Sequence, residues 1–337
     1  MQAKHGEETE MIKQLTAAAF GALLTAQTVA ADEIQINMSL IFQESELLTQ
    51  ELIKVTDKIR ERTNGDVDIQ VFPGGQLPTY KDNLEQVVNG ADWIAVEDLT
   101  YVGDYVPDFG ALAGPMLYDS YDEYLAMMDT DLVADLTAQA EEKGIKIINA
   151  DYMFGFRHMI TNKPIETPAD LEGMKIRVPG SQIFISTLDA MGASPQAIPF
   201  TETYSGVQQG VVEGLEGSIL TMYSTKIYEV ANVMTMTKHF LGTVGIYISP
   251  SVWDKLTPEQ QAIVEEEFAA GAESNTANLI KLDEEYRALL EEQGVTFVEA
   301  DTAAFSELTA SVYNEFPAWS EDIRAVIGAE LEKIRGN

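Results

Sequence analysis

One long helical segment near the end of the chain constrains the fold more than any other feature. It begins at Thr257, which suits the N-cap, while Pro258 suits the first helical position and Gln260 can complete a capping box. The helical apolar pattern then continues to Leu290, and Gly294 ends it. A helix of about 35 residues is roughly 50 Å long, which exceeds the width of one lobe. We therefore expect this helix to span two lobes.

Strand and helix signals alternate along the rest of the chain, which indicates the α/β class. Strands are predicted at 34–40, 67–71, 93–96, 145–148, 175–178 and 211–212, and helices at 48–59, 80–88, 131–143, 183–191 and 203–209. A chain of 337 residues exceeds the usual size of a single hydrophobic core, so its length also favours two lobes.

The first 31 residues have the pattern of an export signal. Lys13 supplies a small positive region, residues 15–26 form a short apolar run, and small residues offer cleavage near Ala30 or Ala31. The alternative is an amphipathic N-terminal helix of the folded domain. The run is shorter than the about 20 apolar residues of a membrane-spanning helix. We expect a periplasmic protein and, since the chain has no cysteine, one without disulfides.

The composition disfavours several classes of function. A formal net charge of −34 repels nucleic acid and anionic lipid, so any anion-binding site must be a sheltered local pocket. Beyond the export signal, His158 and His239 are the only histidines, too few for a ready metal cluster or Ser–His relay. We expect no metal, no cofactor and no enzymatic activity.

Arg177 is the best single candidate for a binding residue. It lies in the β-branched run 175–178, which stops at Pro179. Met174, Ile176 and Val178 share one face of this strand and Arg177 points to the other. Such a residue is more often exposed to solvent. A sheltered guanidinium, however, grips a carboxylate through two parallel hydrogen bonds, so Arg177 suits the capture of a small organic acid.

Arg157 and Phe200 allow two interpretations each. Arg157 is flanked by aromatic and apolar residues, where a lone charge is rarely buried without a partner. It pairs either with a structural carboxylate such as Glu216 or with the ligand. Phe200 follows Ile198-Pro199, and its spacing alone favours ordinary core packing over a role in the site.

Ordered motifs make the chain resemble a known family. Motifs at 72–77, 155–165, 170–179, 210–214, 223–231 and 256–261 read FPGGQL, GFRHMITNKPI, DLEGMKIRVP, GVVEG, YSTKIYEVA and LTPEQQ. Together they resemble the DctP-type solute-binding proteins of tripartite ATP-independent periplasmic (TRAP) transporters, over essentially the whole exported chain. The resemblance implies a two-lobed periplasmic-binding-protein fold, with mixed sheets flanked by helices and a long helix across both lobes. Lobe I is expected at 32–154 plus 243–282, and lobe II at 155–242 plus 283–337.

The resemblance also implies a binding site in the cleft between the lobes. Arg177 corresponds to the family's selectivity arginine, Arg157 to its second pocket arginine and Phe200 to its pocket aromatic. The family usually has Gln-Glu-Asn-Pro where this chain has Leu215-Glu216-Gly217-Ser218, so Gly217 removes a polar contact and opens room. Glu216 and Gly217 are both expected among the residues of the site. The residues expected to face the cleft from lobe I are Gln43, Glu44, Glu97 and Tyr101.

The implied function is that of a binding protein which delivers its ligand to TRAP membrane subunits. The resemblance favours a monomer that holds a small organic acid, whose identity the sequence leaves open. Two alternatives remain, namely an ABC-type periplasmic binding protein and an exported α/β hydrolase that uses two acidic residues. The long helix disfavours the first, and no catalytic constellation supports the second.

Overall fold

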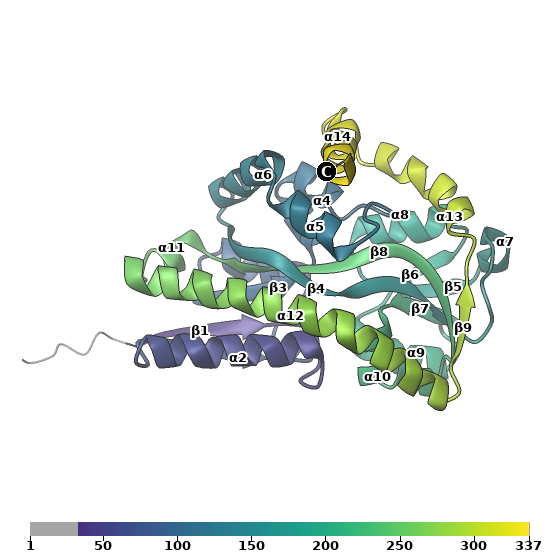
Figure 1. Cartoon of the computed structure of the whole chain (residues 1–337), viewed down its shortest axis with the longest axis horizontal. Coiled ribbons are helices and arrows are strands. Elements are labelled where there is room, and N and C mark those ends of the chain that lie inside the picture. The colour runs from purple at the N-terminus through teal and green to yellow at the C-terminus, as the bar shows by residue number, and fades with distance from the viewer. Residues whose placement is uncertain (1–32, 337) are drawn as a thin grey trace, which may run out of the picture. The chain divides into compact units, whose positions relative to one another are not determined.

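The computed structural model describes residues 33–336, and the predicted export signal lies outside them. Within this range nine strands form one mixed sheet in the order β2-β1-β3-β8-β4-β7-β5-β6, with β9 beside β8 (Figure 1). The strands are β1 (Ile34–Ser39), β2 (Val67–Phe72), β3 (Trp93–Glu97), β4 (Lys146–Thr161), β5 (Lys175–Val178), β6 (Ser194–Ala197), β7 (Gly214–Gly217), β8 (Val233–Ile248) and β9 (Thr296–Glu299).

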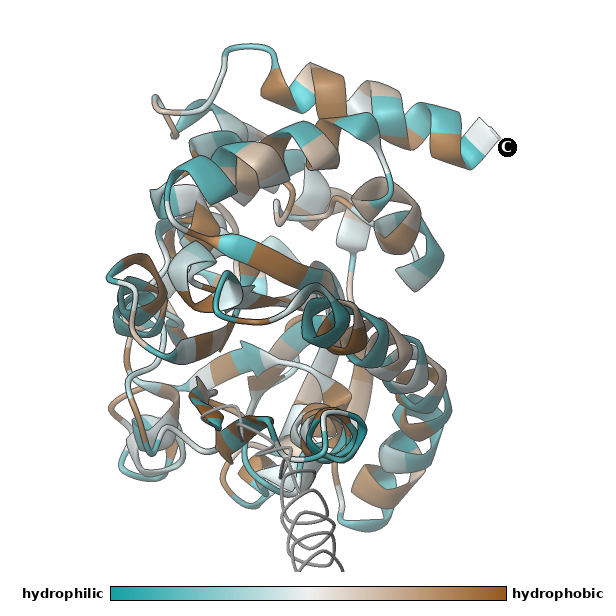
Figure 2. Cartoon of the chain, turned by 90° about the vertical axis from the view of Figure 1, so that its left-hand side faces the viewer, coloured by the Kyte–Doolittle hydropathy of each residue, from teal (hydrophilic) through white to brown (hydrophobic). Residues whose placement is uncertain are grey.

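Helices flank this sheet, as the α/β prediction required. The α-helices are α2 (Leu47–Arg62), α3 (Lys81–Val88), α4 (Pro107–Ala111), α5 (Tyr121–Met128), α6 (Asp131–Glu142), α7 (Pro168–Leu171), α8 (Gln182–Ala190), α9 (Thr203–Gln208), α10 (Ile219–Ser224), α11 (Pro250–Trp253), α12 (Pro258–Glu292), α13 (Thr302–Thr309) and α14 (Ile323–Gly336). The 3-10 helices are η1 (Leu99–Asp104), η2 (Phe200–Glu202), η3 (Ile227–Glu229) and η4 (Ala310–Asn314). Hydrophilic and hydrophobic residues alternate around the helices (Figure 2), the pattern of helices with one buried face. None of the described helices has the length and apolarity needed to cross a membrane.

Two long antiparallel strands connect the two halves of the sheet. β4 and β8 have 16 residues each and pair along most of their length. β3 joins β8 near one end of this pair, whereas β7 joins β4 and β9 joins β8 near the other. The register shifts at Gly155, which pairs with Gly242, and such irregularities let strands bend. Gly155 has a φ of +105°, and a Cβ on Gly242 would lie 2.6 Å from the ring of Phe154.

The long helix predicted from the sequence is present as α12, with 35 residues and the expected capping box of Thr257 and Gln260. It packs along α2, β4 and α10, so it contacts segments assigned to both predicted lobes (Figure 1). Asn275 of α12 donates to the carbonyl of Met153 at 2.7 Å, and Tyr152 donates to the carbonyl of Phe268 at 2.9 Å. The helix is thus fixed to the middle of β4.

Two strand predictions were wrong in extent or place. The strand expected at 145–148 is only the start of the 16-residue β4. The strand expected at 211–212 is absent, because the N–H groups of Val211 and Val212 both donate to the carbonyl of Gly206 in α9, and β7 begins at Gly214 instead. β7 is buried along its whole length, and its glycine at 214 lies against the backbone of β4.

Candidate functional site

A cavity of about 60 Å³ lies where the two halves of the sheet meet. Seven of the nine residues predicted for the site line it: Arg157, Arg177, Phe200, Glu216, Gly217, Glu97 and Tyr101. Further lining residues that no sequence pattern indicated carry polar groups or aromatic rings, namely Phe42, Glu46, Tyr80, Asp98, Phe154, Phe184 and Thr221. The cavity is therefore built from segments far apart in the sequence.

Arg177 is buried in the wall of this cavity and is only 2% exposed. Its Nε donates to the carbonyl of Ile198 at 2.8 Å and its Nη2 to the hydroxyl of Tyr80 at 3.3 Å. The ring of Phe200 lies 5.2 Å from the guanidinium carbon. No carboxylate of residues 33–336 forms an ion pair with it, and burial lowers the pKa of the guanidinium. Arg177 is thus a buried cation held by neutral groups.

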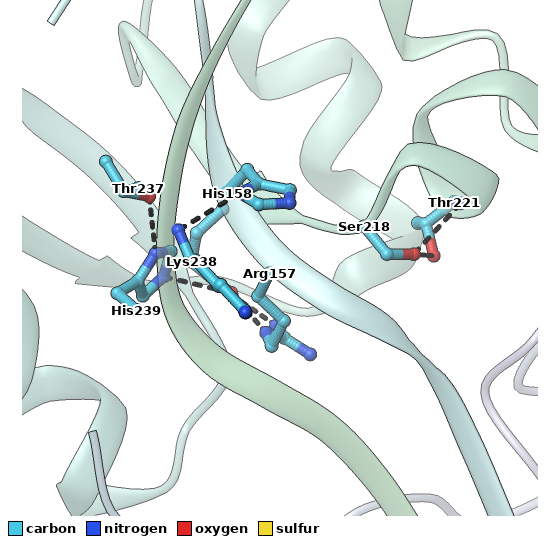
Figure 3. Close-up of polar contacts among 8 residues, drawn as sticks. Arg157, His158, Ser218, Thr221, Thr237, Lys238 and His239 are labelled. Carbon is cyan, nitrogen blue, oxygen red and sulfur yellow. Dashed lines mark hydrogen bonds and ion pairs between the residues drawn. The ribbon is translucent and has the colours of Figure 1, made fainter. Parts of the chain in front are cut away.

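Arg157 is buried too, but its charge is neutralised. Nε and Nη2 of Arg157 donate to the two carboxylate oxygens of Glu216 on the neighbouring strand β7. His239 lies behind the pair, with its Nε2 3.8 Å from Glu216 and its Nδ1 2.8 Å from the hydroxyl of Thr237 (Figure 3). Burial opposes ionisation of Glu216, but Arg157 and His239 hold its pKa at about 2. The pairing with Glu216, one of the two interpretations of Arg157, is confirmed.

Two further buried glutamates of the cavity form no ion pair within residues 33–336. Glu97, 2% exposed, accepts from the backbone N–H of Tyr80 at 2.5 Å and from Asn83 at 2.9 Å. Glu46 accepts from the backbone N–H of Gln43 at 2.8 Å. Burial raises the pKa of Glu97 to about 8 and that of Glu46 to about 7. At neutral pH both carboxyls therefore spend part of the time protonated.

Two tyrosines complete the polar lining. The hydroxyl of Tyr80 accepts from Arg177 and, at 3.1 Å, from the backbone N–H of Phe200, so it bridges distant segments of the chain. Tyr80 has a φ of +58°, which a bulky residue rarely adopts. The ring of Tyr101 lies 5.8 Å from that of Tyr80, and its buried hydroxyl has no hydrogen-bond partner in the described chain.

Gln43 and Glu44 do not line the cavity, contrary to the prediction. Gln43 lines a separate, open pocket, and Glu44 is exposed. The reason is the turn that precedes α2, in which the N–H of Gln43 donates to the carboxylate of Glu46. This hydrogen bond holds Glu46 in the cavity wall in place of its two predicted neighbours.

Gly217 is not required by the backbone. Its φ is not positive, and an added Cβ would meet only Ile160, at an ordinary contact distance of 3.5 Å. Its neighbour Ser218 caps α10 by accepting from the backbone N–H of Thr221, as expected of a serine at an N-cap (Figure 3). A side chain would fit at position 217, so the glycine leaves space in the cavity wall.

Comparison with known proteins agrees with the resemblance read from the motifs. Residues 38–318 match the DctP family, described as bacterial extracellular solute-binding protein, family 7. The C4-dicarboxylate-binding periplasmic protein DctP of Rhodobacter capsulatus is 30% identical, over 83% of this chain and 81% of its own length.

Two crystal structures of TRAP periplasmic solute-binding proteins are similar throughout. The Fusobacterium nucleatum protein, with bound sn-glycerol-3-phosphate, is 47% identical with a TM-score of 0.89, and the match covers 90% of this chain and 98% of that one. The Desulfovibrio salexigens protein, in complex with diglycerolphosphate, is 45% identical with a TM-score of 0.88 and the same coverage. This chain therefore belongs to the DctP family of TRAP periplasmic solute-binding proteins.

Proposed function

We propose that this protein captures a small organic anion, in the first place a carboxylate, in the cavity around Arg177. The observation that carries the proposal is the state of that side chain. It is 2% exposed and lines the cavity, and its hydrogen bonds to the described part of the chain go to neutral oxygens. A buried charge without a counter-charge is costly, and a ligand anion would supply the missing charge.

A phosphate ester is the second candidate for the anionic group. It is favoured by the ligands of the two solved relatives, sn-glycerol-3-phosphate and diglycerolphosphate. The planar fork of an arginine matches both carboxylate and phosphate oxygens, so the same residue serves either head group.

Binding is coupled to closure of two lobes in this proposal. Lobe I (32–154 plus 243–282) contributes Glu97 and Tyr80, and lobe II (155–242 plus 283–337) contributes Arg177 and Phe200. The irregular pairing of Gly155 with Gly242 supports a hinge between them. A ligand that contacts both lobes favours the closed form because it binds that form better. The closed protein then delivers the ligand to TRAP membrane subunits, and no side chain has a catalytic role.

Export by residues 1–31 places the protein in the periplasm, with cleavage near Ala30 or Ala31. The mass of protein purified from periplasmic extracts tests this directly. A mass that still includes residues 1–31 would contradict cleavage.

Isothermal titration calorimetry of the exported protein tests the binding site. A thermal-shift screen of organic acids and phosphate esters first finds a ligand, which stabilises by about 2.7 kcal/mol at 100 times its Kd. Arg177→Ala should then weaken binding at least about tenfold, because one charge-assisted hydrogen bond contributes roughly 1.5–3 kcal/mol. Arg60→Ala, at a side chain that is 61% exposed, is the matched control. Undiminished affinity in Arg177→Ala would reject the assignment.

A further inference from the structure

Three carboxyl groups of the N-terminal part line the same cavity as Arg177. They belong to Glu46, Glu97 and Asp98, and the first two are 6% and 2% exposed. None of them forms an ion pair with an arginine in the part of the chain that the structure describes, since Arg157 is taken by Glu216. The cavity thus combines one uncommitted cation with three carboxyls, an unusual lining for a site that takes anions.

These carboxyls keep free capacity for hydrogen bonds. Both bonds to Glu97 end on Oε1, and Asp98 accepts from the N–H of Thr100 through Oδ1 at 2.9 Å. Within residues 33–336 the hydrogen bonds to these two carboxyls leave Oε2 of Glu97 and Oδ2 of Asp98 without a partner. A ligand inside the cavity therefore meets oxygen atoms that can still accept hydrogen bonds.

Tyr101 gives a second, independent indication of a polar ligand. Its side chain lines the cavity and is 5% exposed, and its hydroxyl has no partner among the described residues. Buried hydroxyls are nearly always hydrogen-bonded, so an unpartnered hydroxyl in a cavity wall has hydrogen-bonding capacity that a ligand or a water molecule can use. A hydroxyl or head-group oxygen of the ligand can form this hydrogen bond.

We propose that the ligand carries a single anionic head group, bound by Arg177, and hydroxyl groups on the remainder of the molecule in place of a second anionic group. This inference rests on the proposed function. A second carboxylate would bring another negative charge to a wall of carboxyls that has no further free cation in the described chain. A hydroxyl group avoids that repulsion, because it donates to Glu97 or Asp98 and accepts from Tyr101.

The protonation of the wall agrees with this preference. The pKa of Glu97 is about 8 and that of Glu46 about 7, so each carboxyl changes between donor and acceptor near neutral pH. A hydroxyl group forms a hydrogen bond with either form, whereas a ligand carboxylate accepts a hydrogen bond only from the protonated form and is repelled by the ionised form. The inference separates this protein from its relative named for C4-dicarboxylates.

Calorimetry with matched pairs of ligands tests the inference. Each pair differs only by replacement of a terminal CH₂OH with a carboxylate: sn-glycerol-3-phosphate and 3-phosphoglycerate, glycerate and tartronate, galactonate and galactarate. The first pair has a phosphate head and the others a carboxylate head. Within the pair that binds, we expect the hydroxyl member to bind at least tenfold more tightly. Equal or tighter binding of the carboxylate member would overturn the inference and leave the proposed function intact. Binding of no member of the panel, nor of any anion in the thermal-shift screen, would overturn both.

Variants of the wall identify its contribution. Glu97→Gln keeps the shape and the acceptor for Tyr80 and Asn83 but removes the acid, and Asp98→Asn does the same next to it. Each variant should reduce, by several-fold, the ratio of the affinities for the hydroxyl and the carboxylate member of the ligand pair that binds. Its melting temperature should show that the protein is folded. Glu61→Gln, an exposed change on α2, should leave this affinity ratio unchanged. An unchanged affinity ratio in both Glu97→Gln and Asp98→Asn would contradict a role for these carboxyls in ligand selection.

Discussion

The two buried arginines of the cavity differ in whether a carboxylate of the protein neutralises their charge. Arg157 and Arg177 are 6% and 2% exposed, and both stack on aromatic rings. Arg157 is neutralised by two hydrogen bonds to Glu216, whereas the hydrogen bonds that Arg177 donates within residues 33–336 go to the oxygens of Ile198 and Tyr80. Burial therefore does not distinguish a structural arginine from the arginine that we propose binds the ligand. The distinction lies in whether the protein itself supplies the counter-charge.

The largest expected effect is a loss of stability when the buried ion pair of Arg157 and Glu216 is broken. Glu216→Gln leaves the Arg157 charge buried without its partner, and the loss of one member of a buried pair typically costs about 3–5 kcal/mol. Urea unfolding of the ligand-free protein measures this loss. Glu141→Gln, an exposed change on α6, is the control. A decrease in the free energy of unfolding of less than about 1 kcal/mol would show that the burial of Arg157 does not require the charge of Glu216.

The pH dependence of stability should have opposite signs on the two sides of the cavity. Glu216 has a folded-state pKa of about 2 against an ordinary 4.5, so its contribution is present above pH 4.5 and is lost as the pH falls. Glu97 has a folded-state pKa of about 8 against 4.5. Its contribution is complete below pH 4.5 and is lost as the pH rises towards about 8.

Urea unfolding between pH 4.5 and 8 tests the Glu97 side of this contrast, and the same measurement below pH 4.5 tests the Glu216 side. Glu97→Gln should reduce the loss of stability between pH 4.5 and 8 by an amount on the order of a few kcal/mol. Glu46→Gln should act in the same direction over the narrower window that ends at about pH 7. Parallel profiles for the wild type and both variants would show that the glutamates titrate normally.

Local signals explain which parts of this structure could be predicted from the sequence. The capping residues Thr257 and Gln260 and the apolar pattern behind them fixed the position of α12, because both act within a few residues of the helix start. The alternation from 34 to 40 likewise marked β1. β4 was predicted too short because most of its residues from 152 to 161 are buried on both faces, which removes the period-two pattern.

The cavity depended on contacts that no local pattern reveals. Arg177 was assigned to the correct strand, but an arginine at the alternate position of a strand is usually exposed. Its burial results from Tyr80, 97 residues away, and from the turn at Phe200. Glu46 and Asp98 could not be selected from among 55 acidic residues. The family resemblance correctly indicated that Glu97 and Tyr101 line the cavity. It also indicated Gln43 and Glu44, whereas the residue of that turn which lines the cavity is Glu46.

Arg177→Lys tests whether the geometry of the guanidinium, and not its charge alone, is needed for binding. Its expected effect is smaller than those above. Lysine keeps the positive charge but loses the planar fork, so one of the two parallel hydrogen bonds to an anion is lost. We expect affinity to fall about tenfold, which corresponds to about 1.4 kcal/mol. Calorimetry measures the affinity, and urea unfolding of the ligand-free variant should show little change. Full affinity in this variant would mean that the site recognises charge without the geometry of the fork.

Tyr80→Phe should give the smallest effect, because it removes one neutral acceptor and keeps the ring. Arg177 and the N–H of Phe200 both lose the oxygen that connects them, at 3.3 and 3.1 Å. A neutral hydrogen bond contributes about 0.5–1.5 kcal/mol, so affinity should fall about two- to tenfold. Tyr105→Phe is a matched control, since Tyr105 lies outside the cavity lining. The hydroxyl of Tyr80 joins residues of both predicted lobes, so the loss should appear as faster ligand dissociation. A change confined to the association rate would instead indicate that Tyr80 acts before closure.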